Sequence, residues 1–324
     1  MNLGAKIYIA GHRGLVGSAL VRLLESRGYS NLVKRSHAEM DLTDQPAVEA
    51  FFRTEKPEFV FLAAAKVGGI MANNTYPAEF IASNLAVQNN VIETAHRHGV
   101  KRLLFLGSSC IYPRDCRQPM KEEYLLTGPL EATNRPYAVA KIAGIEMCWA
   151  YNRQFGTKYL SVMPTNLYGA GDNYDLATSH VIPALIRKFD QAKSENSPTV
   201  TVWGTGTPRR EFMYSDDMAD ACVFLMNLPD EQYHPLLAAD RNDGMPPVVN
   251  IGVGEDMTIA ELASHVAAAT GYTGNIIYDA SKPDGTLRKL MDVSRLTALG
   301  WQATTPFTKG LAHAVQSYRA ISRD

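Results

Sequence analysis

A tyrosine and a lysine four residues apart are the side chains in this sequence best suited to proton and hydride chemistry. Tyr137 and Lys141 open a segment of helical periodicity just after Pro136, so this spacing places both side chains on one helix face. A nearby ammonium favours phenolate, and the pattern therefore predicts a Tyr137 pKa drawn towards neutrality. Such a phenol can exchange a proton with a carbonyl or an alcohol during hydride transfer.

A serine at the end of a predicted strand adds a third group to this chemistry. The apolar run Arg102–Leu106 reads as a buried strand, and Ser108 lies two residues after its end. Carboxyl ends of parallel strands face the ligand crevice, so Ser108 can donate a hydrogen bond to a substrate carbonyl there. We expect Lys141 to hold the cofactor ribose, and the strand end to contact the cofactor through Leu106, Gly107, Ser108 and Ser109.

A glycine-rich turn near the N-terminus predicts the cofactor site. The apolar segment 6–10 leads into three glycines with GxxGxxG spacing, followed by a helical pattern. In this strand–turn–helix context the glycines allow a tight turn and close approach of a pyrophosphate, which the helix N-terminus attracts. The predicted contacts are Gly11, His12, Arg13, Gly14, Leu15, Val16 and Gly17.

The residues after the second strand favour NADPH over NADH. An acidic side chain would hold the ribose 2′-hydroxyl at this point, whereas basic ones hold a 2′-phosphate. Here the sequence has Lys34, Arg35 and His37, without a carboxylate, and Arg13 points the same way. Further predicted cofactor contacts are Asp41 and Leu42 beside the adenine and Ala63, Ala64 and Ala65 at the end of the next strand.

Alternating strands and helices must position these groups. Strands are expected over 6–10, 32–34, 59–63, 102–106 and 159–163, and helices over 18–26, 45–54, 78–98 and 137–155. Such alternation indicates a parallel sheet covered by helices on both faces. The fold class is therefore α/β, a Rossmann-type doubly wound parallel sheet with a smaller α/β C-terminal substrate domain.

The second half of the chain is predicted to divide between two domains. Residues 1–165 form the cofactor domain, to which 215–250 return, while 166–214 and 251–324 form the substrate domain. Helices are expected over 181–193, 218–228, 259–270 and 311–321, and strands over 199–202 and 248–251. Residues 166–174 and 240–247 are read as loops.

Composition argues against several other classes of protein. The chain of 324 residues has 32 Lys plus Arg against 33 Asp plus Glu, a balance that does not suggest nucleic-acid or membrane-surface binding. No apolar run is long enough to cross a bilayer, and the first residues lead straight into a strand. Four cysteines without zinc-finger or CxxC spacing predict reduced thiols, a cytoplasmic location and no metal site.

Several longer motifs resemble the extended short-chain dehydrogenase/reductase family, and within it the enzymes that epimerise and reduce GDP-linked keto sugars. They span essentially the whole chain. The matching segments are GHRGLVGSAL at 11–20, AAAKVGGIMANNTYPAEFI at 63–81, FLGSSCIYP at 105–113, PYAVAKIAG at 136–144, SVMPTNLYG at 161–169, SHVIPALIR at 179–187 and SKPDGTLRKL at 281–290.

The resemblance implies a two-stage reaction on GDP-4-keto-6-deoxy-D-mannose that yields GDP-L-fucose. C3 and C5 are epimerised first, and NADPH then reduces C4. It further implies that Cys110 is the base and His180 the acid of the epimerisation, both types of side chain that titrate near neutrality when perturbed. It also implies a homodimer, with the helices over 78–98 and 137–155 in the interface.

The remaining site residues come from the same resemblance. Pro164, Thr165, Asn166, Leu167 and His180 would contact the cofactor. Arg187, Lys188 and Arg210 are candidates for the diphosphate, Trp203 for the guanine or a ribose, and Asp284 and Lys289 for other parts of the GDP-sugar. His37 departs from the family, which has arginine there, so an exclusive preference for NADPH does not follow.

Two other functions are weighed against this one. Another nucleotide-sugar epimerase or dehydratase would share the Tyr137 and Lys141 pair, but a dehydratase normally has an Asp-Glu pair where this chain has Ser109 and Cys110. A non-catalytic regulator that binds a nicotinamide nucleotide would typically lose the Tyr/Lys pair. Turnover of a GDP-linked keto sugar distinguishes all three.

Overall fold

Six parallel strands form the central sheet of the computed structural model, which describes residues 1–324 except Ala177, 239–246, Pro283 and 323–324. Their order across the sheet is β10-β5-β4-β3-β1-β2. Most of the loop predicted over 240–247 lies outside the described residues. The strands are β1 Ile7–Ala10, β2 Leu32–Val33, β3 Phe59–Leu62, β4 Arg102–Leu106, β5 Tyr159–Pro164 and β10 Val248–Ile251.

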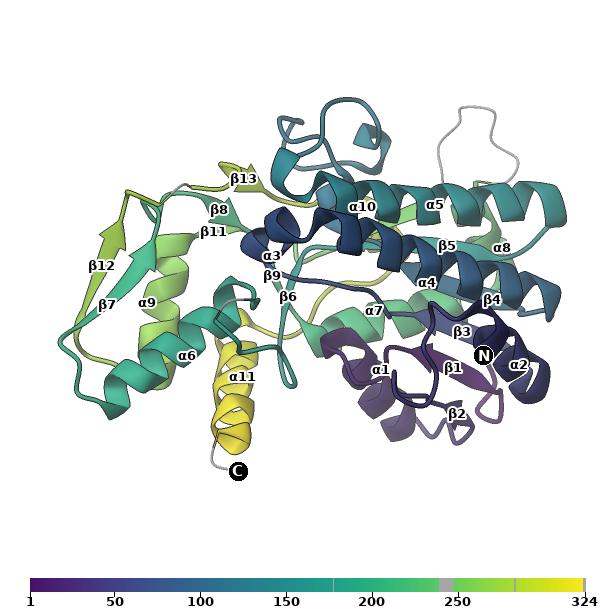
Figure 1. Ribbon diagram of the computed structural model, residues 1–324, viewed down its shortest axis with the longest axis horizontal. Coiled ribbons are helices and arrows are strands. Elements are labelled where there is room, and N and C mark those ends of the chain that lie inside the picture. Colours follow the sequence, from purple (N-terminus) through teal and green to yellow (C-terminus); the bar gives the residue numbers. More distant parts are fainter. Residues whose placement is uncertain (177, 239–246, 283, 323–324) are drawn as a thin grey trace.

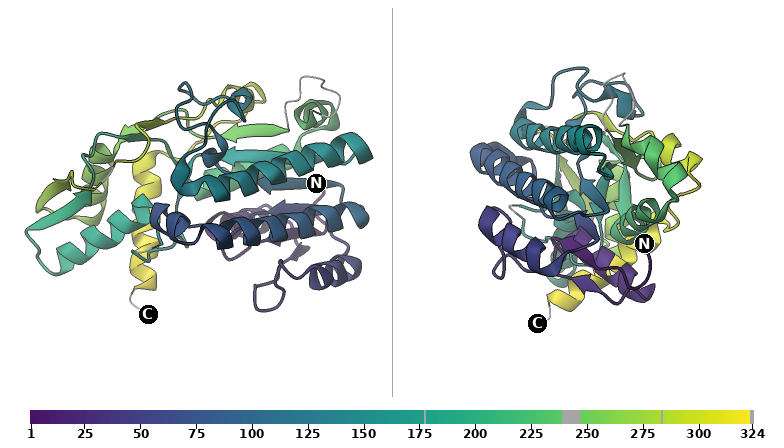
Figure 2. Two further views of the ribbon diagram at one scale, coloured as in Figure 1. Left: turned by 45° about the horizontal axis from the view of Figure 1, so that its top comes forward. Right: turned by 90° about the vertical axis from the view of Figure 1, so that its right-hand side faces the viewer.

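Helices cover both faces of this sheet, as the end-on view in Figure 2 shows. On one face α4 packs between α2 and α5, and on the other α1 packs against α7. Apolar residues fill the space between each helix layer and the sheet. These helices are α1 Leu15–Ser26, α2 Gln45–Glu55, α4 Pro77–Arg97, α5 Arg135–Phe155 and α7 Ser215–Asn227.

The strand order creates a crevice where the chain changes direction. β1 has β2 on one side and β3 on the other, and later strands continue beyond β3. Ligands of doubly wound sheets bind outside the carboxyl ends of strands at such a switch point. The predicted Rossmann-type fold is confirmed, and the glycine turn and the Ala63–Ala65 run both leave the sheet at this crevice.

A second group of elements surrounds its own apolar core. It contains a two-stranded sheet, a three-stranded sheet and three helices. The strands are β7 Thr199–Trp203 with β12 Asn275–Asp279, and β11 Met257–Thr258, β8 Arg209–Arg210 and β13 Arg288–Lys289. The helices are α6 Val181–Ser194, α9 Ile259–Thr270 and α11 Phe307–Ile321.

The prediction of a loop over 166–174 is wrong for its first part. β6 (Asn166–Tyr168) pairs in parallel with β9 (Phe212–Tyr214). Three-residue strands leave little periodicity in a sequence, and here a partner more than forty residues away supplies the hydrogen bonds. The remaining short elements are α3 Ile70–Thr75, α8 Asp230–Tyr233, α10 Ser294–Ala298, η1 Ser109–Ile111, η2 Glu122–Tyr124, η3 Ala132–Asn134 and η4 His234–Leu237.

Segments from the second half of the chain rejoin the central sheet. β10 pairs with β5, and α7 packs against α1. These contacts are compatible with the proposed return of residues 215–250 to the cofactor domain, and the two-domain division stays a proposal.

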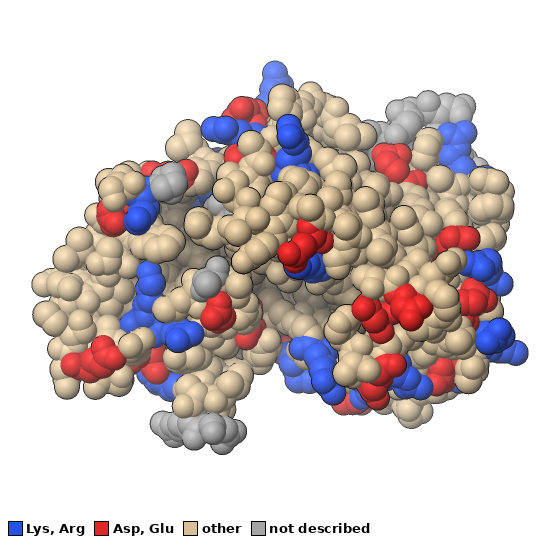
Figure 3. All heavy atoms as spheres, in the orientation of Figure 1, with Lys and Arg blue, Asp and Glu red and all other residues tan. Residues whose placement is uncertain are grey.

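The surface carries charges of both signs on the face shown in Figure 3, where it is hollowed between the part around α6 and α9 and the part around the central sheet. Lys and Arg side chains lie on both sides of this hollow. Within the described part of the chain, every helix is too short or too polar to cross a bilayer.

Gly17 sets how closely α1 approaches the turn after β1. A methyl group at Gly17 would overlap the carbonyl oxygen of Gly11, and one at Gly11 would lie 2.7 Å from the backbone nitrogen of Ala64. Gly11 also has a φ of +83°, which favours glycine. The helix can therefore start against the backbone of two neighbouring strand ends.

Replacing Gly17 with alanine is expected to destabilise the protein by about 1–3 kcal/mol, because backbone must move to admit the methyl group. Urea unfolding of the cofactor-free protein measures this change. Gly4→Ala is the matched control, since its nearest neighbour, a side-chain oxygen of Asn2, would lie 3.9 Å from the new methyl group. Equal stability of the two variants would contradict the prediction.

Candidate active site

A close approach between α5 and β4 positions the tyrosine and lysine. A methyl group at Gly144 would lie 2.5 Å from the Phe105 ring and 2.9 Å from Oε1 of Gln88. The side-chain amide of Gln88, on α4, donates to the carbonyl oxygen of Ala140 at 2.7 Å. α5 is thus held against the sheet one turn after Lys141, with Tyr137 a turn further towards the crevice.

Lys141 lies buried beneath the crevice, with 3% of its surface exposed. Its Nζ donates to the carbonyl oxygen of Leu106 at 2.8 Å and lies 4.8 Å from the ring centroid of Phe105 and 5.9 Å from that of Tyr137. Burial disfavours the charged amine and lowers the pKa of Lys141 to about 7. The end of β4 and the start of α5 are therefore joined by one ammonium group.

Tyr137 differs from the expectation drawn from its lysine neighbour. Burial raises the pKa of Tyr137, Cys110 raises it further, and a hydrogen bond with Ser108 acts in the opposite direction. The predicted fall of this pKa is wrong, because burial disfavours the charged phenolate. The ring also packs edge-on against Phe80 at a centroid distance of 6.2 Å. Tyr137 is thus a neutral phenol that can donate a proton.

Cys110 lies beside this pair on η1, directly after the end of β4. Its backbone nitrogen donates to Oγ of Ser108 at 3.4 Å, and its Sγ accepts a hydrogen bond from Nδ2 of Asn134 at 3.1 Å. The structure therefore brings Ser108, Cys110, Tyr137 and Lys141 together. Sequence reasoning missed Asn134, although an asparagine at the start of the Tyr137 helix could have drawn attention to it.

His180 lies on a different element. It directly precedes α6, and desolvation by the surrounding protein lowers its pKa. The preceding residues contact the loop that follows β3, where the backbone nitrogen of Gly69 donates to the carbonyl oxygen of Thr178 at 3.1 Å. Since β3 lies beside β4, this contact carries His180 to the same edge of the sheet as Ser108.

The turn after β1 fits the diphosphate of a dinucleotide. α1 starts at Leu15 after Gly14, which makes no side-chain capping bond, and its first turn carries no acidic residue. Its backbone N–H groups and its dipole therefore face the crevice, where an anion satisfies both. Arg13 is exposed beside this turn, and His12, Val16 and the small Ala63–Ala65 run lie partly exposed around it.

The basic residues after β2 are not equally free to bind a phosphate. Arg35 forms an ion pair with Glu55 at 2.6 Å and lies over the Phe51 ring, 5.5 Å from its centroid. His37 is 83% exposed and lies 3.7 Å from Asp41. Of the predicted 2′-phosphate ligands, Arg13 and His37 are thus more accessible than Arg35, which already has a carboxylate partner.

The segment after β5 is held by a buried glutamate. Thr165 Oγ1 and Asn166 Nδ2 both donate to the carbonyl oxygen of Glu211, at 3.2 and 2.9 Å. Pro164 and Thr165 are buried, while Asn166 and Leu167 are partly exposed. The predicted cofactor contacts 164–167 therefore form a fixed wall at the end of β5, and Glu211 is a second residue that sequence reasoning missed.

A tryptophan and two lysines form one group on the α6 side. The Trp203 side chain is 59% exposed. Nζ of Lys188 lies 5.1 Å from its ring centroid and Nζ of Lys282 lies 5.6 Å from it. Arg187 faces another way, because its guanidinium donates to the carbonyl oxygen of Tyr174 at 3.0 Å. An exposed ring between two cations suits a nucleotide base or ribose with a diphosphate nearby.

Arg210, Asp284 and Lys289 form the adjoining group. Arg210 and Lys289 are paired in register on β8 and β13. Asp284 accepts hydrogen bonds from the backbone nitrogen and the hydroxyl of Thr205, at 2.9 and 2.7 Å, just after Trp203. Asp284 also acts electrostatically on Arg210. The structure therefore brings most of the predicted substrate ligands to one region.

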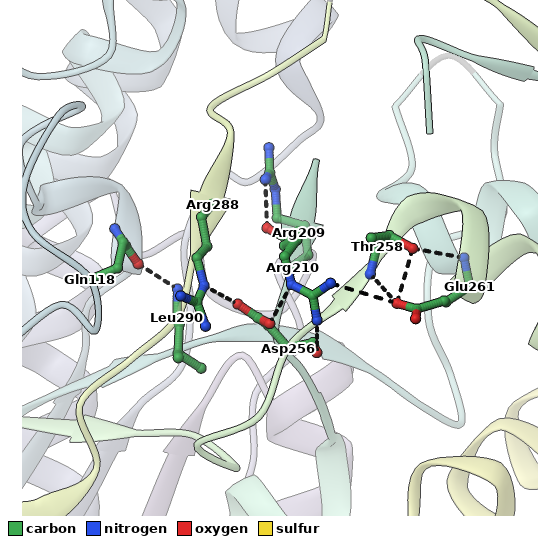
Figure 4. A network of polar contacts seen from close by, with 8 residues as sticks. All are labelled: Gln118, Arg209, Arg210, Asp256, Thr258, Glu261, Arg288 and Leu290. Atoms are coloured by element: carbon green, nitrogen blue, oxygen red, sulfur yellow. Dashed lines mark hydrogen bonds and ion pairs between the residues drawn. The ribbon is translucent and has the colours of Figure 1, made fainter. Parts of the chain in front are cut away.

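Asp256 binds two of the three arginines of this region, so that Arg210 has no ion pair with it (Figure 4). Its carboxylate, 3% exposed, accepts from Nε of Arg209 at 2.7 Å and from Nε of Arg288 at 2.5 Å. Burial opposes its charge, but these hydrogen bonds prevail and lower the pKa of Asp256. Arg210 instead donates to the carbonyl oxygen of Arg209 at 2.8 Å.

Comparison with known proteins agrees with this geometry. Residues 7–252 match the model of the NAD dependent epimerase/dehydratase family. The chain is 53% identical over 311 residues to the GDP-L-fucose synthase of Escherichia coli K12, covering 96% of this chain and 95% of that protein. It is 55% identical over 314 residues to GDP-L-fucose synthase 1 of Arabidopsis thaliana, covering 97% and 93%.

A solved structure shows the same likeness in three dimensions. The GDP-mannoheptose C4 reductase of Campylobacter jejuni, determined with NADP bound, is 39% identical and superimposes with a TM-score of 0.87. The match covers 98% of this chain and 99% of the reductase. The similarity thus extends through both the central sheet and the elements that carry Trp203 and Arg210.

The buried amine of Lys141 predicts that the stability of the folded protein rises with pH above neutrality. Its folded pKa of about 7 lies below the ordinary 10.5, so the unfolded chain binds more protons between these values and stability rises with pH there. Lys141→Met removes this cost. Its stabilising effect on the cofactor-free protein should be about 2–3 kcal/mol larger at pH 6 than at pH 9.

Chemical unfolding at the two pH values measures this difference. Lys309→Met, which changes an exposed lysine, controls for loss of one positive charge and should shift stability little and equally at both pH values. A gain for Lys141→Met that is independent of pH would show that the amine keeps its ordinary pKa in the folded protein.

Proposed function

The chain belongs to the NAD dependent epimerase/dehydratase family, and we propose that it converts GDP-4-keto-6-deoxy-D-mannose to GDP-L-fucose with NADPH. The observation that carries this proposal is the arrangement at the end of β4. Ser108, Tyr137 and Lys141 surround a position for a ketone, and the thiol of Cys110 lies beside them. Relatives more than 50% identical along nearly the whole chain are GDP-L-fucose synthases.

The first stage inverts C3 and C5 of the hexose. Both carbons neighbour the C4 ketone, so their protons become acidic when Ser108 and Tyr137 hydrogen-bond to the C4 oxygen. Cys110 as thiolate takes a proton from one face, and the electron pair moves into an enolate on the C4 oxygen. His180 returns a proton to the opposite face, which inverts the carbon. Solvent then takes the proton from Cys110 and returns one to His180, so that the same pair can act on the next carbon while the ketone stays in place.

The second stage reduces the same ketone. NADPH, when bound in the crevice, supplies a hydride to C4. Tyr137 donates its proton to the C4 oxygen as negative charge develops there, and the raised pKa of this phenol keeps the proton available at neutral pH. Lys141 supports the Tyr137 ring and the end of β4 from below. One carbonyl site therefore serves both stages.

The GDP group is proposed to lie across the α6 side of the hollow. Trp203 stacks on the guanine or its ribose, and Lys188 and Arg210 bind the diphosphate, where guanidinium nitrogens match phosphate oxygens. The substrate class is supported by the relatives, which include a GDP-L-fucose synthase and a GDP-mannoheptose C4 reductase. Asp284 and Lys289 complete this end of the site.

A homodimer in the cytoplasm is proposed as the working form. α5 carries two exposed apolar side chains, Val139 and Phe155, which are 41% and 47% exposed. The ring of Phe155 stacks on that of His96 at a centroid distance of 4.2 Å. A second copy would bury these groups. The four cysteines are free thiols, which suits a reducing compartment.

Labelling in deuterated water tests both stages together. Incubation with GDP-4-keto-6-deoxymannose and NADPH should give GDP-fucose with deuterium at C3 and C5 and oxidised cofactor in equal amount. Cys110→Ser should reduce the exchange at least 100-fold, because the alkoxide of serine is not populated at neutral pH. Mass spectrometry and NMR of the product measure both effects.

The alternatives give different products. A reduced sugar without deuterium at C3 and C5 would make the protein a C4 reductase, and full exchange in Cys110→Ser would remove Cys110 from the mechanism. Nucleotide binding without turnover would indicate a regulator. Cys222→Ser, which changes a buried thiol on α7, controls for loss of a sulfur.

The charges around the crevice predict that the protein binds NADPH more tightly than NADH, and that a further basic side chain would increase this preference. Arg13→Ser should lower the ratio of NADPH to NADH affinity by about tenfold, the loss of one charged hydrogen bond to phosphate. His37→Arg should raise the ratio by a similar factor. Fluorescence titration with both cofactors measures it. Arg27→Ser, at the far end of α1 and paired with Asp220, is the control, and unchanged ratios in all three variants would contradict Arg13 as a phosphate ligand.

A further inference from the structure

Asn134 occupies a helix start without capping it. It precedes α5 as the N-terminal capping residue, yet its side chain makes no capping hydrogen bond. An asparagine in this place ordinarily accepts from the second or third backbone N–H of the helix. The second position here is Pro136, which has no N–H. The third position, Tyr137, keeps its N–H, but the side chain of Asn134 makes no capping hydrogen bond.

The side-chain amide of Asn134 instead contacts the thiol of Cys110. Nδ2 of Asn134 donates to Sγ of Cys110 at 3.1 Å. Because Tyr137 is three residues further along α5, a single helix start fixes both the thiol and the phenol. α3 packs against η3, which contains Asn134. The distance between the two proton-transfer groups is therefore set by one rigid element.

The amide oxygen of Asn134 points to a ligand. Oδ1 is buried and has no hydrogen-bond partner among the residues that the structure describes. A buried polar oxygen without a partner is costly, and such an atom in a functional site commonly awaits a group that arrives with a ligand. A hexose next to Cys110 offers hydroxyl groups of the required kind.

We propose that Asn134 is a positioning residue that holds the Cys110 sulfur with its amide N–H and receives a hydroxyl of the substrate hexose with its amide oxygen. This inference rests on the proposed function for the identity of the hexose, but the contact with the thiol does not. The N–H stabilises the thiolate and keeps its lone pair aimed at the carbon that loses a proton.

Thiol reactivity in the cofactor-free protein tests the sulfur contact without any substrate. In a Cys116→Ser background, the rate of iodoacetamide alkylation at Cys110 is followed against pH by mass spectrometry. Asn134→Asp should move the midpoint up by about one pH unit or more, since a carboxylate replaces the donor. Asn134→Ser should move it up by less, because it removes the donor without adding charge. An unchanged midpoint in both variants would overturn the proposal.

The two substitutions also separate this role from a structural one. Serine and aspartate are both good helix N-caps, so α5 should start as before in either variant. Asn31→Asp, at an exposed position before the amino end of β2, controls for the added negative charge and should leave the alkylation midpoint where it is. A shift with this control would show that net charge alone moves the thiol.

Exchange with solvent tests the second half of the proposal. With oxidised NADP the ketone is not reduced, so deuterium uptake at C3 and C5 of GDP-4-keto-6-deoxymannose reports proton transfer alone. Asn134→Asp should slow uptake about tenfold or more at pH 7, and Asn134→Ser by less, in step with the smaller thiolate fraction of each variant. KM should rise several-fold for Asn134→Ser and less for Asn134→Asp, which keeps oxygen acceptors. An equal KM in all three proteins would exclude the hydroxyl contact.

Failure of this inference differs from failure of the proposed function. If the unmodified protein exchanges no deuterium, the proposed reaction is wrong, while the alkylation midpoints still decide whether Asn134 holds the sulfur. If exchange proceeds but neither the midpoint nor the exchange rate changes in the variants, the reaction stands and Asn134 has no part in it.

Discussion

The burial of one ammonium group is the constraint on which the reaction centre depends. Lys141 can lie beneath the crevice for two reasons. Gly144 lets α5 approach Phe105, and the carbonyl oxygen of Leu106 accepts a hydrogen bond from the Lys141 amine. Desolvating a cation costs free energy, which is why its pKa falls to about 7. In return for this cost, the fold holds a positive charge and a phenol where a ketone and an anionic cofactor would meet. The end of β4, the start of α5 and the chemistry of Tyr137 and Lys141 therefore depend on one another.

A buried carboxylate extends this arrangement to the substrate side. Oε1 of Glu211 accepts from the backbone nitrogens of Val253 and Gly254, at 2.5 and 2.8 Å, and Oε2 accepts from that of Met291 at 2.8 Å. Burial raises the pKa of Glu211, and these donors oppose the rise. Its own carbonyl oxygen holds Asn166. The loops after β5 and β10 and the segment after β13 are thus all bound to Glu211, which fixes the predicted cofactor contacts relative to the residues proposed to bind GDP.

The spacing of residues in the sequence predicted the elements that depend on near neighbours in the chain. It missed the elements that depend on partners far away in the chain. The glycine turn, β4 and the Tyr137–Lys141 face follow from residues within a few positions of one another, and the strand over Arg102–Leu106 was predicted to the residue. β6 depends on a distant strand, and the two-residue strands β8, β11 and β13 depend on mutual pairing. The direction of the Tyr137 pKa was misjudged because spacing reveals a neighbouring charge but not the depth of burial.

Charge at this site depends on pairing rather than on the number of basic residues. Arg35 is bound to Glu55, and Asp256 binds Arg209 together with Arg288. Ion pairs of this kind already offset the charge that an anionic ligand would need. We therefore propose exposed Arg13 and partly buried Arg210 as phosphate ligands, rather than their paired neighbours. The same reasoning explains why a run of basic residues in the sequence overstates the strength of a phosphate site: each carboxylate partner lies elsewhere in the chain and becomes visible only when the fold brings it near.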